Sequence, residues 1–216
     1  GKTNILKLKE FFPGFEYHHG GLDNYINAGK HISKTAINTV NIDYLKKTSI
    51  SLLEAGVNNL LIEKPGSLSI DGLKEIKKLS NKKNATVSIA YNRRFYSSVL
   101  TLKNLIEEDG GVSSCHFEFT EWVETIGPDT HSKKALNKWI LSNSSHVIDT
   151  VFFLIKNPKE LYSKLLGKNE INWHPNASIF IGHGISESGV PFTYHSNWGS
   201  AGRWSIEILT KKRRFY

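Results

Sequence analysis

The sequence predicts an α/β protein in two parts, a parallel-sheet domain followed by an α+β domain with a largely antiparallel sheet. In the first half, strand and helix patterns alternate with short connections, which is typical of parallel βαβ units. In the second half, four strand candidates follow one another, which favours antiparallel pairing. Because the pattern changes near residues 91–94, we expect one domain over residues 1–93 and a second over residues 94–216.

The first domain opens on a helix, a short strand and a loop. Apolar residues at helical spacing predict a helix over residues 2–12, and residues 15–18 form a candidate strand. Residues 20–34 are polar and punctuated by glycine, so we expect a loop there. The run Leu60-Leu61-Ile62 predicts a strand that is buried on both faces. A strand, a helix, this strand, a helix and a strand follow in turn over residues 35–40, 43–55, 57–63, 69–81 and 85–91.

The second domain begins with a helix over residues 97–109, which Gly110-Gly111 closes, and a strand over residues 112–120. An irregular stretch then precedes a helix over residues 146–155. Residues 199–202 predict a hairpin turn between the last two strands. The four consecutive strand candidates cover residues 161–166, 177–182, 191–198 and 204–210.

Composition and charge limit the classes of protein to consider. Hydrophobic residues make up 39% and charged residues 22%, as in ordinary globular proteins. No apolar run approaches the ~18 residues of a membrane span, and no signal-peptide core is visible, so we expect a cytoplasmic protein. The single cysteine, Cys115, excludes an internal disulfide and a Cys-rich zinc site, and we expect no metal. A net charge of +8 favours anionic partners such as dinucleotides and phosphorylated sugars, and no nucleic-acid-binding module is recognisable.

The tripeptide Glu63-Lys64-Pro65 is the first candidate for chemistry. It lies at the carboxyl end of a predicted strand, where open α/β sheets bind their ligands. A lysine at this position can donate a hydrogen bond to a substrate hydroxyl or carbonyl and stabilise an alkoxide that develops there. The alternative interpretation is a solvated lysine in a turn.

His146 is the second candidate. It begins a helix after the polar run Ser142-Asn143-Ser144-Ser145, with Asp149 one turn further along. The ordinary pKa of an imidazole suits it to move a proton near neutral pH. Asp149 could orient the imidazole or favour the helix N-terminus. The alternative for His146 is a histidine that caps or packs the helix start.

Five segments in this order resemble the Gfo/Idh/MocA oxidoreductases, the relatives of glucose–fructose oxidoreductase and inositol dehydrogenase. The resemblance extends over residues 1–216. It implies a Rossmann-like domain followed by a domain with a largely antiparallel sheet, NAD or NADP as cofactor, and a sugar, sugar-nucleotide or cyclitol alcohol as substrate. The segments that carry it are Thr39-Val40-Asn41, residues 52–56 (Leu-Leu-Glu-Ala-Gly), Glu63-Lys64-Pro65, residues 91–95 (Tyr-Asn-Arg-Arg-Phe) and residues 145–149 (Ser-His-Val-Ile-Asp).

The resemblance also implies roles for particular residues. Lys64 and His146 match the catalytic lysine and histidine, and a cis peptide bond is expected before Pro65. The segment after the first strand, the glutamate near the nicotinamide and the segment that enters the second domain are expected to contact the cofactor. The expected cofactor-binding residues are Gly1, Thr39, Asn41, Glu63, Lys64 and Asn92, and the expected substrate-binding residues are Arg94, Asn143 and Asp149.

The chain also departs from the pattern of this family. No G-x-G-x-x-G motif is present, and we interpret Gly1 as the last glycine of that pyrophosphate-binding fingerprint. We therefore expect the Rossmann part to be incomplete at its start and near residues 17–35, and the last sheet to continue beyond Tyr216. Many members have an aspartate four residues before the histidine, where this chain has Ser142.

Two further expectations concern function and assembly. Ser142 favours an alternative in which the protein binds a dinucleotide or a sugar without catalysis, as a regulator or scaffold, whereas Lys64 and His146 argue against it. The last three strands carry more apolar surface than one helix layer can cover, so we expect a homodimer or homotetramer that forms through the C-terminal sheet. The apolar residues in question are Phe180, Phe192, Tyr194, Trp198, Trp204 and Ile206.

Overall fold

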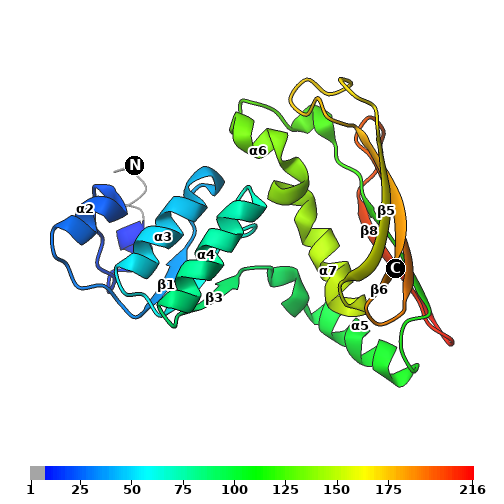
Figure 1. The fold of residues 1–216 in the computed structure, drawn as a ribbon, viewed down its shortest axis with the longest axis horizontal. Helices are drawn as coiled ribbons and strands as arrows, with labels where there is room; N and C mark the ends of the chain where they lie inside the picture. The colour runs from blue at the N-terminus through cyan, green and yellow to red at the C-terminus, as the bar shows by residue number, and fades with distance from the viewer. Residues whose placement is uncertain (1–7) are drawn as a thin grey trace.

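The computed structural model describes residues 8–216, which build two sheets with helices packed against them (Figure 1). Of the helix expected over residues 2–12, the described part is helical from residue 8 to residue 11. Gly1 lies outside the described residues. Within residues 8–216, no helix is both long enough and apolar enough to cross a membrane.

The first sheet has three parallel strands in the order β1-β2-β3, as the βαβ pattern predicts. In the register of these strands, Ala36 lies opposite Leu60, which in turn lies opposite Val87. The three strands all end at one edge of the sheet. The strands are β1 (Thr35–Asn38), β2 (Asn59–Ile62) and β3 (Thr86–Ile89), and the helices between them are α3 (Leu45–Glu54) and α4 (Ile70–Lys82).

Both of these helices pack on the same face of the first sheet (Figure 1). Leu60 and Ile62 of β2 therefore lie in a core with residues of α3 and α4. Leu61, between them, points to the other face and is 37% exposed. The prediction that β2 is buried on both faces is therefore wrong, because the described chain covers one face of the sheet only.

The helices of the first part begin and end where capping chemistry predicts. The Ser69 side chain caps α4 by accepting a hydrogen bond from the backbone N–H of Gly72 at 3.1 Å. Asn41 caps the short 3₁₀ helix η1 (Ile42–Tyr44) in the same way. α3 stops before Gly56, whose φ of +97° is the left-handed conformation that glycine adopts most easily.

Two predictions for the residues before β1 are wrong. Residues 15–18 form no strand, because no strand of residues 8–216 lies beside them to supply hydrogen bonds. The expected loop over residues 20–34 contains a helix, α2 (Gly21–Asn27). Its two initial glycines take positive φ angles before the helix turns begin, and Leu22 packs against the core of the first sheet. The glycines therefore open this helix where the pattern was interpreted as breaking it.

The second sheet is mixed and largely antiparallel, as predicted, with strand order β5-β6-β7-β4-β8-β9. Only β4 and β7 pair in parallel, with Phe117 opposite Tyr194. The boundary proposed between residues 93 and 94 falls within the 3₁₀ helix η2 (Asn92–Phe95), which lies between the two sheets. The strands are β4 (Ser114–Phe119), β5 (Pro158–Leu166), β6 (Ile179–Ser186), β7 (Pro191–Asn197), β8 (Trp204–Leu209) and β9 (Arg214–Phe215).

The hairpin predicted at residues 199–202 is wrong, because β4 lies between β7 and β8. Phe117 of β4 pairs with Tyr194 on one side and with Ile206 on the other. Each edge of β4 is thus occupied by one of the two strands that were expected to pair with each other. Because β7 and β8 follow one another in the sequence, a hairpin was the simplest interpretation. In the structure β4, which comes earlier in the sequence, lies between them.

Helices cover one face of the second sheet (Figure 1). They are α5 (Ser97–Glu108) and α7 (Ser145–Ile155), and the stretch expected to be irregular holds the short helices η3 (Val123–Thr125) and α6 (Lys133–Asn137). The six residues that were expected to give an exposed apolar face belong to the hydrophobic core on this side of the sheet or pack against it. Phe180, Phe192 and Trp198 are buried, and Tyr194, Trp204 and Ile206 pack against them. The argument for assembly from these six residues is therefore wrong.

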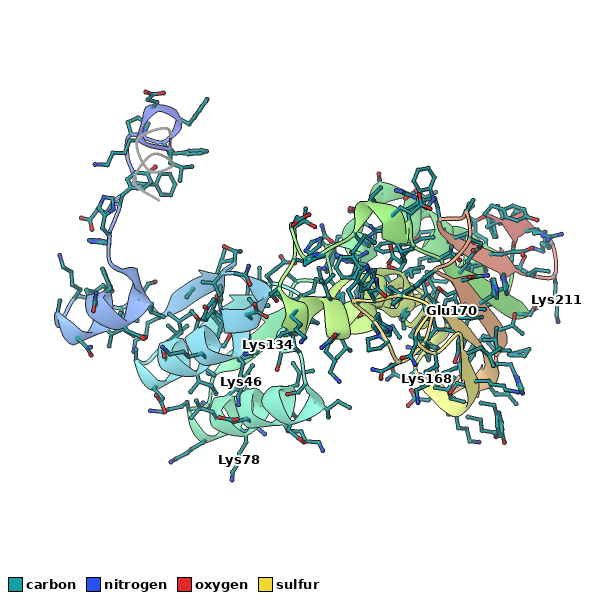
Figure 2. The ribbon with its side chains drawn as sticks, turned by 90° about the horizontal axis from the view of Figure 1, so that it is seen from above. Lys46, Lys78, Lys134, Lys168, Glu170 and Lys211 are labelled. Atoms are coloured by element: carbon teal, nitrogen blue, oxygen red, sulfur yellow. The ribbon has the colours of Figure 1, made fainter. Side chains whose placement is uncertain are left out.

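The charge of the molecule is distributed along its length. The labelled side chains Lys46 and Lys78 lie on the helices of the first sheet, whereas Lys168 and Lys211 lie at the second sheet (Figure 2). Lys46 forms an exposed ion pair with Glu75 at 2.5 Å. The excess of basic residues is thus spread over the surface of both parts.

Candidate functional site

The carboxyl edge of the parallel sheet carries most of the expected cofactor-binding residues. Thr39 follows β1, Glu63 and Lys64 follow β2, and Asn92 follows β3. Thr39 and Asn92 are exposed, and Glu63 is half-buried with its backbone N–H bonded to the Asn38 carbonyl at 2.8 Å. The exposed Asn41 lies at the same edge, where its side-chain oxygen caps η1. Gly1 lies outside the described residues.

Lys64 reaches from this edge to the second part of the molecule. The peptide bond between Lys64 and Pro65 is cis, as the resemblance implies. The Nζ atom of Lys64 donates a hydrogen bond to the backbone carbonyl of Ser142 at 2.5 Å. Burial lowers the pKa of Lys64, against the opposing charge of Glu63. The residue is therefore held in position by a backbone acceptor, with a weakened preference for the charged form.

Ser142 belongs to a π-helical turn, η4 (Ile140–Ser144), which leads directly into α7. Single π-helical turns often mark functional sites in helices. The hydroxyl of Ser142 donates to the carbonyl of Ala135 at 2.8 Å and to that of Lys138 at 3.1 Å. The side chain thus points away from Lys64. At the position where the oxidoreductases that the sequence resembles often have an aspartate, this chain offers Lys64 a carbonyl oxygen.

His146 lies in the first turn of α7, close to Lys64. Its ring contacts Tyr91, with 6.1 Å between ring centres, and Trp204, with 6.3 Å. Nδ1 is buried and has no hydrogen-bond partner, which leaves Nε2 as the nitrogen that a substrate can reach. Burial, together with the positive charges of Lys64 and Arg93, lowers the pKa of His146 to about 4. The two predicted catalytic residues are therefore close enough to influence each other electrostatically.

Arg94 and Asp149, both expected to bind substrate, bind each other. Arg94 donates to the two carboxylate oxygens of Asp149, from Nε at 2.8 Å and from a terminal nitrogen at 2.5 Å. Asp149 therefore does not hold the imidazole of His146. The pair lines a cavity of about 530 Å³ together with Tyr91.

Asn143 lies in different surroundings, beside a buried glutamate that the sequence analysis did not identify. The Oε1 atom of Glu121 accepts hydrogen bonds from Asn143 at 2.9 Å, from Ser144 at 3.0 Å and from the indole of Trp204 at 3.1 Å. Burial raises the pKa of Glu121, and these donors oppose that effect. Its position directly after the strand predicted over residues 112–120 was the available signal, because ligand-binding side chains often follow strands.

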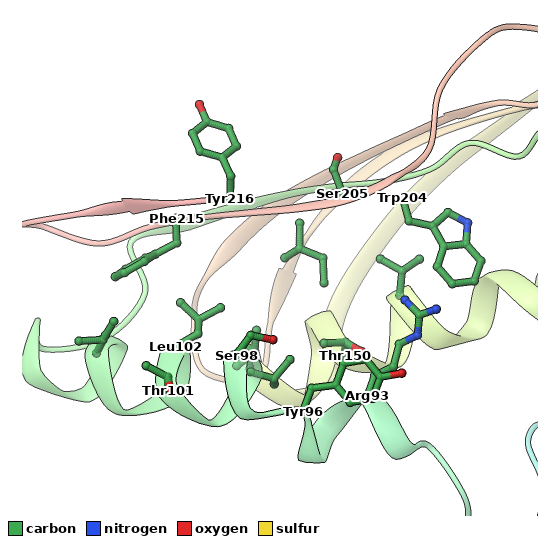
Figure 3. Close-up of a pocket in the computed structure, with 15 residues that line it drawn as sticks. Arg93, Tyr96, Ser98, Thr101, Leu102, Thr150, Trp204, Ser205, Phe215 and Tyr216 are labelled. Carbon is green, nitrogen blue, oxygen red and sulfur yellow. The ribbon is translucent and has the colours of Figure 1, made fainter.

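The sequence analysis also did not identify Arg93 and Trp204 as residues of the site. The Arg93 guanidinium lies over the Trp204 ring, 4.5 Å from its centre. Figure 3 shows this pair at one end of an apolar groove of about 660 Å³ between α5 and β8, with Phe215 and Tyr216 toward the other end. Among residues 8–216, no group of three histidine, cysteine or acidic side chains could hold a metal ion.

Comparison with known proteins gives matches among solved structures only. No model of a protein family matches the chain, and no curated protein matches it. An oxidoreductase from Thermotoga maritima aligns over 99% of this chain and 66% of its own, with TM-score 0.79 and 16% identity. Myo-inositol 2-dehydrogenase from Lactobacillus plantarum aligns over 99% and 65%, with TM-score 0.73 and 15% identity. The WlbA dehydrogenase from Chromobacterium violaceum, solved with NADH and UDP-GlcNAcA, aligns over 98% and 62%, with TM-score 0.75 and 17% identity.

These likenesses define the class of fold. It is the two-domain fold of oxidoreductases, with a parallel sheet followed by a largely antiparallel one. More particularly, it is the fold of dehydrogenases of the Gfo/Idh/MocA type. The chain spans between 53% and 66% of the length of the solved structures that it resembles.

Proposed function

We propose that the protein is an NAD(P)-dependent oxidoreductase that acts on a sugar, sugar-nucleotide or cyclitol alcohol. The observation that carries the proposal is the hydrogen bond from Lys64 to the carbonyl of Ser142, which brings the end of β2 beside His146. Lys64 follows a strand of the first sheet and His146 lies in a helix that packs on the second sheet, so nothing local in the sequence requires them to meet. Two proteins of the same fold support the substrate class, since one is named an inositol dehydrogenase and another was solved with NADH and a sugar nucleotide.

The residues present fit the nicotinamide end of the cofactor. The exposed polar side chains of Thr39 and Asn92 follow neighbouring parallel strands, where open α/β sheets bind dinucleotides. We propose that they hold the cofactor together with Asn41, Glu63 and Lys64, and that Gly1 contributes to the pyrophosphate site. The nicotinamide, when bound, would exchange a hydride with the substrate carbon.

The chain's own residues would then manage the substrate oxygen. Nζ of Lys64 would donate a hydrogen bond to that oxygen and stabilise its developing negative charge. Nε2 of His146 would accept the hydroxyl proton, because the lowered pKa keeps the ring neutral at pH 7. Tyr91 and Trp204, which contact the ring, would limit its rotation.

Lys64→Ala and His146→Ala test this assignment. We expect each to lower the rate of NAD(P)H formation by about a hundredfold or more, because each removes a group that handles the reacting proton or oxygen. The assay follows absorbance of the reduced cofactor with sugars, sugar nucleotides and inositols as substrates. Lys77→Ala and His195→Ala, which alter exposed residues of the same types, serve as controls. Full activity of His146→Ala would end the assignment.

The alternative of a binding protein without catalysis also has a specific observation in its favour. Ser142 has no acidic group, and its hydroxyl donates to the carbonyls of Ala135 and Lys138. This position therefore supplies no side-chain group to the Lys64–His146 pair. Such a protein would bind NADH without exchanging its hydride. Cofactor fluorescence, which measures NADH binding, distinguishes the two functions when it is combined with the turnover assay. NADH binding with no turnover of any tested substrate favours the alternative.

A further inference from the structure

A cavity of about 540 Å³ is lined in part by Trp204, whose ring centre lies 6.3 Å from that of His146. Its walls come from the end of β4, from the segment before α7 and from the start of β8. Arg93 and Arg203 both line it, so we call it the arginine cavity. Arg93 also connects it to the proposed catalytic pair, since its charge contributes to the lowered pKa of both Lys64 and His146.

One wall of the arginine cavity is fixed by Glu121. Its buried carboxylate accepts the side-chain hydrogen bonds of Asn143, Ser144 and Trp204 described above. Asn143 and Trp204 themselves line the cavity. A polar group and an indole held in place by one buried acceptor suit a hydroxylated ring, which needs hydrogen bonds at its edge and apolar contact on its face.

The two arginines of the cavity have no acidic partner. Neither Arg93 nor Arg203 forms an ion pair with an acidic side chain of residues 8–216. The hydrogen bonds of Glu121 come from neutral donors. Two guanidinium groups therefore face one cavity, and no carboxylate of the described chain pairs with either of them.

Aromatic rings orient both guanidinium groups. Arg93 lies over Trp204 at 4.5 Å and Arg203 over Trp122 at 5.6 Å, and both tryptophans line the cavity. A guanidinium held over an aromatic ring by cation–π attraction keeps N–H groups free to donate. Paired N–H donors of this kind match the oxygen atoms of a carboxylate or a phosphate. The lysines on the outer surface are, in contrast, hydrated point charges (Figure 2).

We propose that the arginine cavity binds an oxyanion group of the substrate, a carboxylate or a phosphate, through Arg93 and Arg203. This inference rests on the proposed function, because it names the substrate class of the same site. The substrate is then a sugar derivative that carries an acidic group. Neutral sugars and cyclitols leave both arginines without a partner and bind more weakly.

Calorimetric titration of the purified protein with glucose, glucuronate and glucose 6-phosphate tests the proposal without any need for turnover. We expect at least one anionic ligand to bind about tenfold or more tightly than glucose, as one charge-assisted contact provides. The ligand that gains tells a carboxylate site from a phosphate site. Arg203→Met should remove the preference for the anionic ligand, and Arg93→Met should weaken it in the same direction. Lys211→Met, an exposed lysine on the second sheet, removes a charge outside the cavity and should keep the preference.

Three results would overturn the proposal: equal affinity for the three ligands, no binding of any of them up to about 10 mM, or a preference that survives both arginine substitutions. Its failure can be told apart from failure of the proposed function. An anion preference that needs Arg203, without turnover on any substrate, retains the cavity and rejects the enzyme. Turnover that needs Lys64 and His146 but is equal on glucose and glucuronate retains the enzyme and rejects the oxyanion site.

Discussion

His146 is kept neutral by its surroundings and not by a hydrogen-bond partner. Its Nδ1 atom is buried and unpartnered, while Asp149, one turn further along α7, is bound by Arg94. Burial and the charges of Lys64 and Arg93 lower its pKa from an ordinary value of 6.5 to about 4. Because the unfolded chain binds this proton more tightly, the contribution of His146 to stability falls as the pH falls from 6.5 toward 4.

Lys64→Met should raise the pKa of His146. The substitution removes a nearby positive charge, so protonation of the ring becomes less costly, but burial remains and keeps the pKa below 6.5. An NMR titration of the imidazole signals of His146 measures both values. In the unaltered protein, the rate of the proposed alcohol oxidation should be constant from neutral pH down to about pH 5 and fall below it. A wild-type pKa near 6.5 would contradict the description of this site.

Motifs identified the residues with a recognisable neighbourhood in sequence, and missed those whose neighbourhood forms only in space. Lys64 stands in a tripeptide at the end of a strand, and His146 begins a helix after a polar run. Glu121 follows a predicted strand, but its hydrogen-bond partners are known only once β8 brings the Trp204 indole to it, 83 positions later. The partner of Asp149 lies 55 positions earlier, so the sequence offered His146 on the same helix as the nearer choice.

At the level of elements, the Arg94–Asp149 pair joins η2 to α7. The Asp149 side chain is 12% exposed and that of Arg94 is 39% exposed. Two parallel hydrogen bonds fix the direction of the guanidinium as well as its position. η2 leads out of the first sheet, and α7 carries His146. The Arg94–Asp149 pair therefore helps to fix the position of α7 relative to the first sheet.

Arg94→Met should lower the free energy of unfolding by about 2 kcal/mol, because it leaves a buried carboxylate without its donors. Urea denaturation followed by circular dichroism measures the change. Lys46→Met, which breaks the exposed pair with Glu75, should cost less than about 1 kcal/mol and serves as the control. The double variant Arg94→Met with Asp149→Asn should recover part of the loss. A cost for Arg94→Met no larger than that of the control would show that the pair does not stabilise the junction.

The helices and strands themselves were more predictable than their arrangement. The Ser69 cap and the left-handed Gly56 are local signals, and the helices next to them match the pattern closely. The pairing partners of a strand are chosen by distant residues. The position of β4 between β7 and β8 could therefore not be predicted from the turn-like residues 199–202.

At the level of the whole molecule, one face of the second sheet carries no helix of residues 8–216. Ile181 and Ile185 of β6 are 37% and 39% exposed there, beside Tyr162 of β5. The homodimer or homotetramer expected through the C-terminal sheet remains a prediction. We now expect it to form through this face and not through the six apolar residues named in the sequence analysis.

Ile185→Glu should therefore convert an oligomer into monomers without changing the secondary structure, because a charge buried between two apolar faces is costly. Solution scattering gives the mass of the particle, and circular dichroism checks the fold. Asn104→Glu, an exposed position of α5 on the other side of the sheet, measures the effect of an added charge away from this face. A monomeric mass for the unaltered protein would contradict the expectation.

The central place of β4 has a consequence for synthesis on the ribosome. Phe119 of β4 accepts its hydrogen bond from Ser196 of β7 across 77 positions of sequence. At roughly 5–20 residues per second, about 4–15 s pass between the emergence of the two. During that interval both edges of β4 and the rings of Phe117 and Phe119 have no partner strand. The growing chain therefore exposes an unpaired, aggregation-prone strand for several seconds, and we expect chaperones to bind this segment first.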